Sequence, residues 1–235
     1  MSDFVIPPPA TPSVAVAGST ARFPIRRVFC VGRNYAAHAR EMGQNPDREA
    51  PFFFMKPADA VVDAKGTVAY PPATHDLHHE VEMVIALKAG GVNVSPENAL
   101  ALVWGYGLGV DLTRRDMQAV AKEMRRPWDF AKGFDASAPC SALHPVGEVG
   151  HPVDVPISLE VNGVVKQKGT LQEMIWPVAD VISHISHFVT LAPGDLIFSG
   201  TPAGVGPLQP GDRVRGILAG IAAFDFEVGP SPQKD

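Results

Sequence analysis

The stretch HDLHHEVEMVIAL, residues 75–87, decides how the chain folds around its most polar positions. From Glu80 onward, apolar side chains alternate with the two glutamates, and this period of two predicts a β-strand over residues 80–87. Glu80 and Glu82 then point to the same side, roughly 7 Å apart. Two carboxylates at that spacing repel each other unless water, a base or a cation separates them, so a divalent cation would turn the repulsion into binding.

A second strand supplies a third carboxylate. The segment WGYGLGVD, residues 104–111, is apolar, is broken by glycines and stops at Asp111. Together with Glu80 and Glu82, Asp111 would offer three hard oxygen ligands to an octahedral Mg²⁺ or Mn²⁺ and leave positions for water and substrate oxygens. The alternative is that the two glutamates line a solvated strand face and that Asp111 caps the next helix.

The histidines before the strand leave a different metal open. His78 has the same parity as Glu80 and Glu82, and an imidazole ligand would favour zinc or another transition ion. We rank this reading second, and we favour a solvated loop for His75, His78 and His79 over a ligand role for any of them.

A histidine and a glutamate in GRNYAAHAREMG form a candidate base. A short helix over 35–42 would place His38 and Glu41 on one face, where the carboxylate could orient the imidazole as a general base for water. The alternative is a surface ion pair, which is common and weakly stabilising.

Basic and amide side chains follow in TRRDMQAVAKEMRRPWDFAKGFD. A helix over 113–125, capped by Asp111 or Thr113, would place Arg115 and Gln118 on one face, with Lys132 in a short loop after it. These groups could grip a carboxylate and a polarised carbonyl. Arg114, Lys122 and Arg125 are interpreted as exposed helix charge.

SGTPAGVG, residues 199–206, lacks the lysine of a phosphate-binding loop and predicts a tight loop that presents Thr201.

Composition excludes several classes of protein. The chain has 235 residues, a net charge of −5 and scattered basic residues, which argues against a nucleic-acid partner. The longest apolar run, residues 99–110, contains glycines and is too short to span a membrane. No export signal is visible at the N-terminus, and two cysteines, Cys30 and Cys140, favour buried thiols and a cytoplasmic location.

The remaining pattern predicts an α+β, strand-rich domain. Further strands are expected at 28–32, 61–62, 157–166, 196–199, 213–218 and 222–228, with a hairpin turn at Asn162-Gly163. Few helices are expected; besides those above, one begins near Pro96 and one at Pro177. We predict a loose proline-rich segment over 1–24, one catalytic domain over 25–228 and a tail over 229–235.

Six motifs in order resemble the fumarylacetoacetate hydrolase family: GRNYAAHAREMG, PFFFMKPADAVV, HHEVEMVIAL, GYGLGVDLTRRDMQ, PWDFAKGFD and SGTPAGVG. The chain is most similar to the short fumarylpyruvate and acylpyruvate hydrolases. The resemblance implies a strand-rich mixed β-sandwich roll, a homodimer and a metal held by Glu80, Glu82 and Asp111. It also implies a water-activating dyad of His38 and Glu41 on a lid helix. Substrate or oxyanion contacts are implied for Arg115, Gln118, Lys132 and Thr201.

The implied activity is hydrolysis of the C–C bond of 2,4-dioxo acids, with fumarylpyruvate giving fumarate and pyruvate in aromatic degradation of the gentisate type. In that mechanism Mg²⁺ or Mn²⁺ chelates the 1-carboxylate and 2-oxo group, His38 activates water, and Lys132 with Gln118 stabilises the oxyanion. Arg33 or Arg40, near the lid helix, is a candidate partner for a distal carboxylate of the substrate. The alternatives are oxaloacetate decarboxylation, isomerisation of unsaturated dioxo acids, and a noncatalytic protein that binds keto acids.

Overall fold

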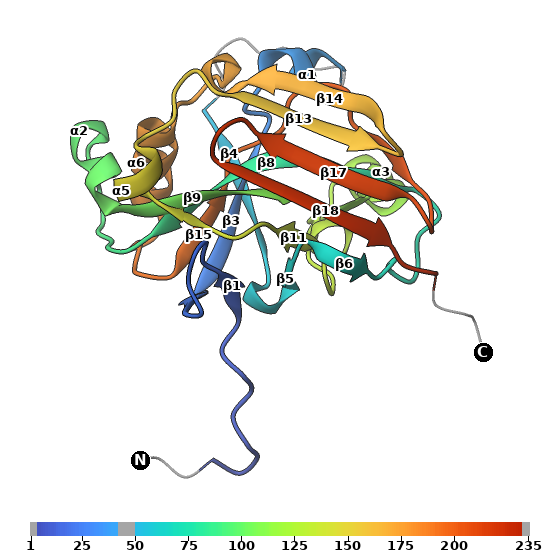
Figure 1. Ribbon diagram of the computed structural model, residues 1–235, viewed down its shortest axis with the longest axis horizontal. Helices are drawn as coiled ribbons and strands as arrows, with labels where there is room; N and C mark the ends of the chain where they lie inside the picture. The colour runs from blue at the N-terminus through green and yellow to red at the C-terminus, as the bar shows by residue number, and fades with distance from the viewer. Residues whose placement is uncertain (1–3, 42–49, 232–235) are drawn as a thin grey trace.

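The structure is a computed structural model in which residues 4–41 and 50–231 are described (Figure 1). The strands of these residues form four sheets. In the largest sheet the order is β4 (Phe52–Lys56), β3 (Arg27–Gly32), β15 (Asp195–Phe198), β8 (Val81–Leu87), β9 (Val103–Val110), β11 (Ala138–Cys140) and β5 (Val61–Asp63), and β12 (His144–Pro145) also pairs with β9. In the second sheet the order is β14 (Val164–Thr170), β13 (Pro156–Val161), β17 (Arg213–Leu218), β18 (Ala222–Val228) and β6 (Lys65–Val68). The two small sheets are β1 (Ser13–Ala15) with β2 (Arg22–Pro24), and β10 (Thr113–Arg114), β7 (Leu77–His79) and β16 (Gly206–Leu208) in that order.

The helices are short and lie around the sheets (Figure 1). They are α1 (Ala36–Glu41), α2 (Pro96–Ala99), α3 (Arg115–Glu123), α4 (Asp129–Lys132), α5 (Val146–Val149) and α6 (Val178–Phe188), with 3₁₀ turns η1 (Ala58–Ala60), η2 (Leu100–Leu102) and η3 (Leu171–Glu173). Many strands with few helices confirm the predicted strand-rich α+β class, with mixed sheets curled about one another.

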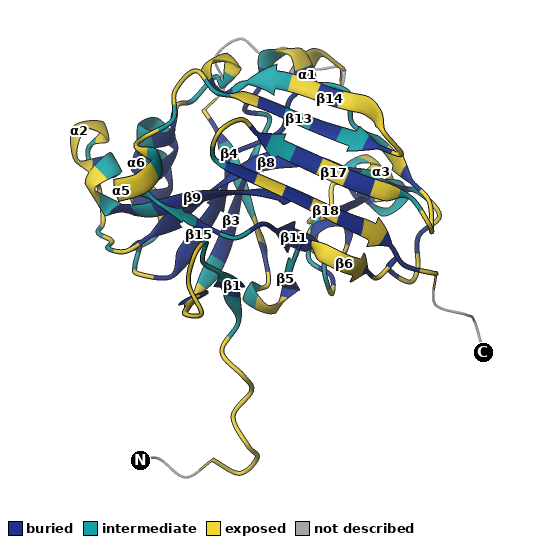
Figure 2. Ribbon diagram, in the orientation of Figure 1, coloured by how far each residue is buried: buried dark blue, intermediate teal, exposed yellow. Residues whose placement is uncertain are grey.

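Strand β8 is the centre of the fold because both of its faces are buried. Val81, Met83, Ile85 and Leu87 face the larger core, which includes apolar side chains of the five-stranded sheet, whereas Val84 and Ala86 belong to a second core with Phe198 and Val28. In Figure 2, β17 and β18 alternate between buried and exposed residues, as expected for a sheet with one solvated face. The predicted strand is therefore confirmed, but the solvated face considered for its glutamates is absent.

The predicted start of α3 is wrong by two residues. Thr113 and Arg114 pair with Leu77 and His78 of β7, so α3 begins at Arg115. Its N-cap residue is Arg114, which makes no capping hydrogen bond through its side chain. Neither Asp111 nor Thr113 caps the helix, since both side chains contact lysine side chains in the interior.

Two other local predictions have different outcomes. The Asn162-Gly163 hairpin is confirmed: both residues have positive φ, 53° and 77°, and Val161 pairs with Val164. The loose segment predicted over 1–24 is too long, because β1 and β2 pair from Ser13 onward and Val14 is fully buried. The predicted buried state of Cys30 and Cys140 is confirmed.

Candidate functional site

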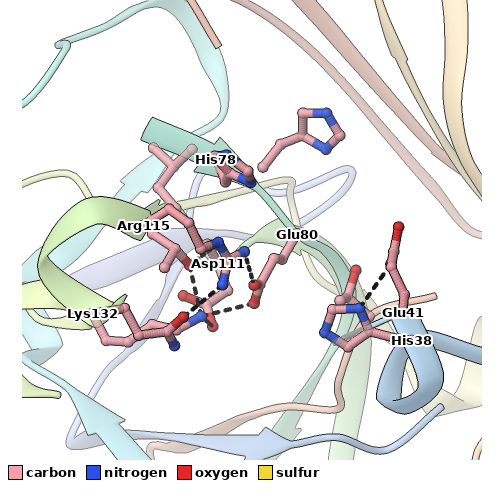
Figure 3. Close-up of polar contacts among 12 residues, drawn as sticks. His38, Glu41, His78, Glu80, Asp111, Arg115 and Lys132 are labelled. Atoms are coloured by element: carbon pink, nitrogen blue, oxygen red, sulfur yellow. Dashed lines mark hydrogen bonds and ion pairs between the residues drawn. The ribbon is translucent and has the colours of Figure 1, made fainter. Parts of the chain in front are cut away.

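Three acidic side chains meet where β8 and β9 come together. Val81 is paired with Val110, and just beyond that pair the Asp111 N–H donates to the Glu80 carbonyl at 2.8 Å. This backbone register places one carboxylate oxygen each from Glu80, Glu82 and Asp111 within 4.8 Å of one another, and all three residues are buried. Glu80 and Asp111 point toward each other in Figure 3. The structure thus brings together the three predicted ligands.

Buried cations surround the carboxylates. Lys132 Nζ lies 2.7 Å from Glu80 Oε2 and 2.7 Å from Asp111 Oδ2, and it donates to Thr113 Oγ1 (Figure 3). Arg115 contacts Glu80 Oε1 at 2.5 Å. On the other side of the cluster, Lys56 Nζ lies 2.8 Å from Asp111 Oδ1. Each of these two carboxylates is therefore compensated by two cationic groups.

The two glutamates have opposite pKa shifts. Burial by itself would raise the pKa of Glu80, but Lys132 and Arg115 outweigh it and hold the pKa below its ordinary value. Burial also raises the pKa of Glu82, and there the negative charges of Asp111 and Glu80 add to the effect, so the pKa lies well above its ordinary value. The Gly200 N–H donates to Glu82 Oε2 at 2.7 Å but does not offset these causes.

This donor set fits a hard divalent cation. Carboxylate oxygens are the ligands that Mg²⁺ and Mn²⁺ prefer, and a dication would stabilise the ionised form of Glu82 that burial disfavours. In the described part of the chain this trio is the one group of three potential ligand side chains close enough to hold an ion. The zinc alternative gains no support, because His78 Nε2 contacts Asp76 Oδ1 at 2.9 Å and is outside the group.

The prediction of a solvated loop for all three histidines is wrong. His75 is exposed, but His78 and His79 belong to β7 and His79 is fully buried. His79 Nδ1 lies 2.9 Å from Gln167 Oε1. No sequence pattern indicates this contact, since Gln167 occurs among the exposed polar residues of β14.

The candidate base lies across the cavity from the acidic trio. His38 Nδ1 is 3.3 Å from Glu41 Oε2, and Figure 3 shows this pair on α1, apart from the cluster that contains Lys132. His38 is buried, and Glu41 accepts the Gly204 N–H at 3.1 and 3.2 Å. Glu41 is exposed, and its carboxylate connects His38 to the backbone at Gly204. Met42, the predicted end of this helix, lies outside the described residues.

A cavity of about 40 Å³ connects these groups. It is lined by His38, Glu80 and Glu82 together with all the predicted substrate contacts, namely Arg33, Arg115, Gln118, Lys132 and Thr201. Within it, Arg115 Nη1 donates to Gln118 Oε1 at 2.7 Å, as their spacing on one helical face predicts. Lys132 belongs to the short helix α4 and not to a loop.

The hydroxyl of Thr201 already has two partners. It donates to the Val81 carbonyl at 2.8 Å and accepts from Gln167 Nε2 at 2.7 Å. Its single proton is thus engaged, so in this arrangement Thr201 can accept a hydrogen bond from a ligand but cannot donate one. The predicted tight loop does present Thr201 to the cavity.

Two of the charges predicted to be exposed are not. Arg114 is buried, donates to the Phe130 carbonyl at 3.1 Å and stacks on Phe134. Lys122 is half-buried and lines the cavity. For Lys122 the helical spacing from Gln118 and Arg115 was a usable signal, whereas the packing of Arg114 depends on a contact across the fold.

Comparison with known proteins gives consistent matches over most of the chain. The family model described as fumarylacetoacetate (FAA) hydrolase C-terminal matches residues 27–228. The fumarylpyruvate hydrolase of a Ralstonia species is 41% identical over 192 residues, which are 81% of this chain and 100% of that protein. The oxaloacetate tautomerase of Escherichia coli K12 is 40% identical over 198 residues, 84% of this chain and 90% of that protein.

A solved structure extends the likeness to the whole fold. The crystal structure of fumarylpyruvate hydrolase from Pseudomonas aeruginosa, in complex with Mn²⁺ and pyruvate, superposes with a TM-score of 0.95 at 47% identity. The match covers 97% of this chain and 99% of that chain. No helix among the described residues is both long enough and apolar enough to cross a membrane.

Proposed function

The chain belongs to the fumarylacetoacetate hydrolase family, and from this we propose that it is a divalent-cation-dependent hydrolase of acylpyruvates. Its preferred substrate is fumarylpyruvate, which it cleaves to fumarate and pyruvate. The observation that carries the proposal is that Glu80 and Glu82 of the acidic trio line the same cavity as His38, which Glu41 contacts through Nδ1. The relative from Pseudomonas aeruginosa, which holds Mn²⁺ and pyruvate, supports it.

Glu80, Glu82 and Asp111 would hold the cation. Mg²⁺ or Mn²⁺ bound there would supply positive charge next to the carboxylate and the 2-oxo group of the substrate, which makes carbon an acceptable leaving group.

His38 would act as the general base. Its Nε2 takes a proton from water while Glu41, anchored by the Gly204 N–H, holds Nδ1. The hydroxide attacks the C4 carbonyl, and the Lys132 ammonium and the Gln118 amide stabilise the negative charge on its oxygen. The C3–C4 bond then breaks, its electron pair passes to C3, and the proton that His38 took from water is returned to C3, which completes pyruvate.

Lys132 is suited to the oxyanion role because it stays protonated. Burial lowers its pKa, but Asp111 and Glu80 outweigh that effect, so the pKa is raised. The Arg115 guanidinium, fixed by Glu80 and Gln118, would bind the carboxylate of the pyruvate half.

A second candidate function is tautomerisation of oxaloacetate, because the oxaloacetate tautomerase of E. coli is nearly as similar in sequence as the fumarylpyruvate hydrolase of Ralstonia. That reaction needs proton transfer but no attack by water. A buried, carboxylate-oriented histidine serves both reactions, so their rates in one protein must be compared.

The test measures pyruvate release from fumarylpyruvate and keto–enol exchange of oxaloacetate, each with EDTA or with Mn²⁺ or Mg²⁺. We expect cation-dependent release of pyruvate, with kcat reduced about 10²- to 10⁴-fold in His38→Ala. His75→Ala, which changes an exposed histidine outside the cavity, is the matched control. Pyruvate release that persists in EDTA, or faster tautomerisation without any release, would remove the hydrolase proposal.

A further inference from the structure

An aromatic wall with two cations against it forms part of the lining of the cavity. Trp128 contacts Phe52 and Phe54 with ring centroids 5.3 and 5.9 Å apart. Lys122 Nζ lies 5.3 Å from the centre of the Trp128 ring, and Arg33 Cζ lies 5.0 Å from that of Phe52. All five side chains line the cavity. Cation–π attraction holds the ammonium and guanidinium groups against the rings. Both groups can donate charge-assisted hydrogen bonds to an anion.

One face of α3 connects this wall to the acidic trio. Arg115, Gln118 and Lys122 are at positions i, i+3 and i+7, so they lie along the same face, and all three line the cavity. Arg115 contacts Glu80 at one end. At about 1.5 Å per residue, Lys122 lies roughly 10 Å farther along the helix. A fully extended seven-carbon acid spans roughly 8 Å between its terminal carbons, which this separation accommodates.

The positive charge of Lys122, at the far end of the α3 face, is less compensated by carboxylates than the charges of Arg115 and Lys132 near the trio. Arg115 and Lys132 form ion pairs with Glu80 and Asp111, whereas no ion pair of Lys122 with a carboxylate is found in residues 4–41 and 50–231. Burial, together with the nearby charges of Arg115 and Arg33, lowers the pKa of Lys122. An anion bound beside Lys122 would therefore stabilise its charged form.

We propose that Lys122, held on Trp128 at the end of the α3 face, selects acyl groups that terminate in a carboxylate. Arg33 adds positive charge on the same aromatic wall. The inference rests on the proposed function and deepens it, because it names the feature that distinguishes fumarylpyruvate from neutral acylpyruvates. Lys122 is a specificity determinant for the distal carboxylate and takes no part in the bond cleavage.

The test compares two substrates on the Mn²⁺-loaded enzyme. One is fumarylpyruvate, and the other is the same acid with a methyl group in place of the distal carboxylate. The ratio of their kcat/KM values is the readout. We expect Lys122→Met to reduce this ratio about 10- to 100-fold, mainly through KM for fumarylpyruvate, because a charge-assisted hydrogen bond is lost. Lys122→Arg should keep most of the ratio.

Lys88→Met, which removes an exposed lysine that does not line the cavity, is the control and should leave the ratio unchanged. An unchanged ratio in Lys122→Met, or an equal loss for both substrates, would overturn the inference. If the unmodified enzyme cleaves both substrates equally well, the inference fails while the proposed function stands. If it cleaves neither substrate, the proposed function fails and the inference with it.

Discussion

Replacing Lys132 with methionine tests the view that the acidic trio depends on positive charge for its stability. The ammonium is buried and lies 2.7 Å from both Glu80 Oε2 and Asp111 Oδ2. Removing one partner of a buried ion pair costs about 3–5 kcal/mol, because the remaining charge loses its compensation. In a chain of 235 residues each kcal/mol shifts the melting temperature by about 2–4 °C, so we expect a drop of roughly 6–20 °C in EDTA.

A dication should recover part of this loss. It carries the same sign of charge as Lys132 and would be bound by the same carboxylates, so saturating Mn²⁺ should raise the melting temperature of Lys132→Met more than that of the unmodified protein. The assay is thermal unfolding followed by circular dichroism, with EDTA or with Mn²⁺. Lys65→Met is the control, because Lys65 is exposed and its contact with Asp63 is a surface pair worth less than about 1 kcal/mol.

Two results would refute this reasoning. If Lys132→Met melts within error of Lys65→Met in EDTA, the buried ammonium does not stabilise the trio. If Mn²⁺ raises the melting temperature of both proteins equally, the cation and Lys132 do not compensate the same charges.

Two further predictions concern Glu82 and Gln167. Because the pKa of Glu82 is raised in the folded state, the native protein without metal binds a proton that the unfolded chain releases, so stability in EDTA should fall as the pH rises above about 4.5. Urea unfolding between pH 5 and 7 should show Glu82 contributing a slope of up to about 1.4 kcal/mol per pH unit, and a slope unchanged in Glu82→Gln would contradict it. Gln167→Leu should cost about 3 kcal/mol, because Gln167 is fully buried and bonds Val81, His79, Thr201 and Pro202. A loss no larger than that of Lys168→Ala, its exposed neighbour, would show that this network is dispensable.

The acidic trio was predictable because it follows from local rules. Alternation in a strand places Glu80 and Glu82 on one side, and a second strand that ends at Asp111 can bring it to the same end of a sheet. The same holds for His38 and Glu41, which are three residues apart in a helix. Rules of this kind need only the sequence between the residues concerned.

The compensation of the trio's negative charges by buried lysines was not predictable, because it depends on contacts between elements that are distant in the sequence. Lys56 comes from β4 and Lys132 from α4, yet both ammonium groups contact Asp111 and Lys56 also bonds the Lys132 carbonyl. The contacts of Gln167 were not predictable for the same reason, since its partners belong to β7, β8 and the loop after β15. For Lys122, the helical spacing from Arg115 and Gln118 indicates the face that it shares with them, but its contact with Trp128 depends on how the segment before α4 packs.

The acidic trio and the aromatic wall of the cavity are positioned by different elements of the fold. Glu80, Glu82 and Asp111 are held by the pairing of β8 with β9, whereas the aromatic wall and Lys122 come from β4, α3 and the segment before α4. Exchanging residues on those peripheral elements can redesign the choice of substrate while the ion-holding framework keeps its geometry. The cavity thus combines a part whose geometry depends on the pairing of two strands with a part whose side chains can be exchanged independently of that pairing.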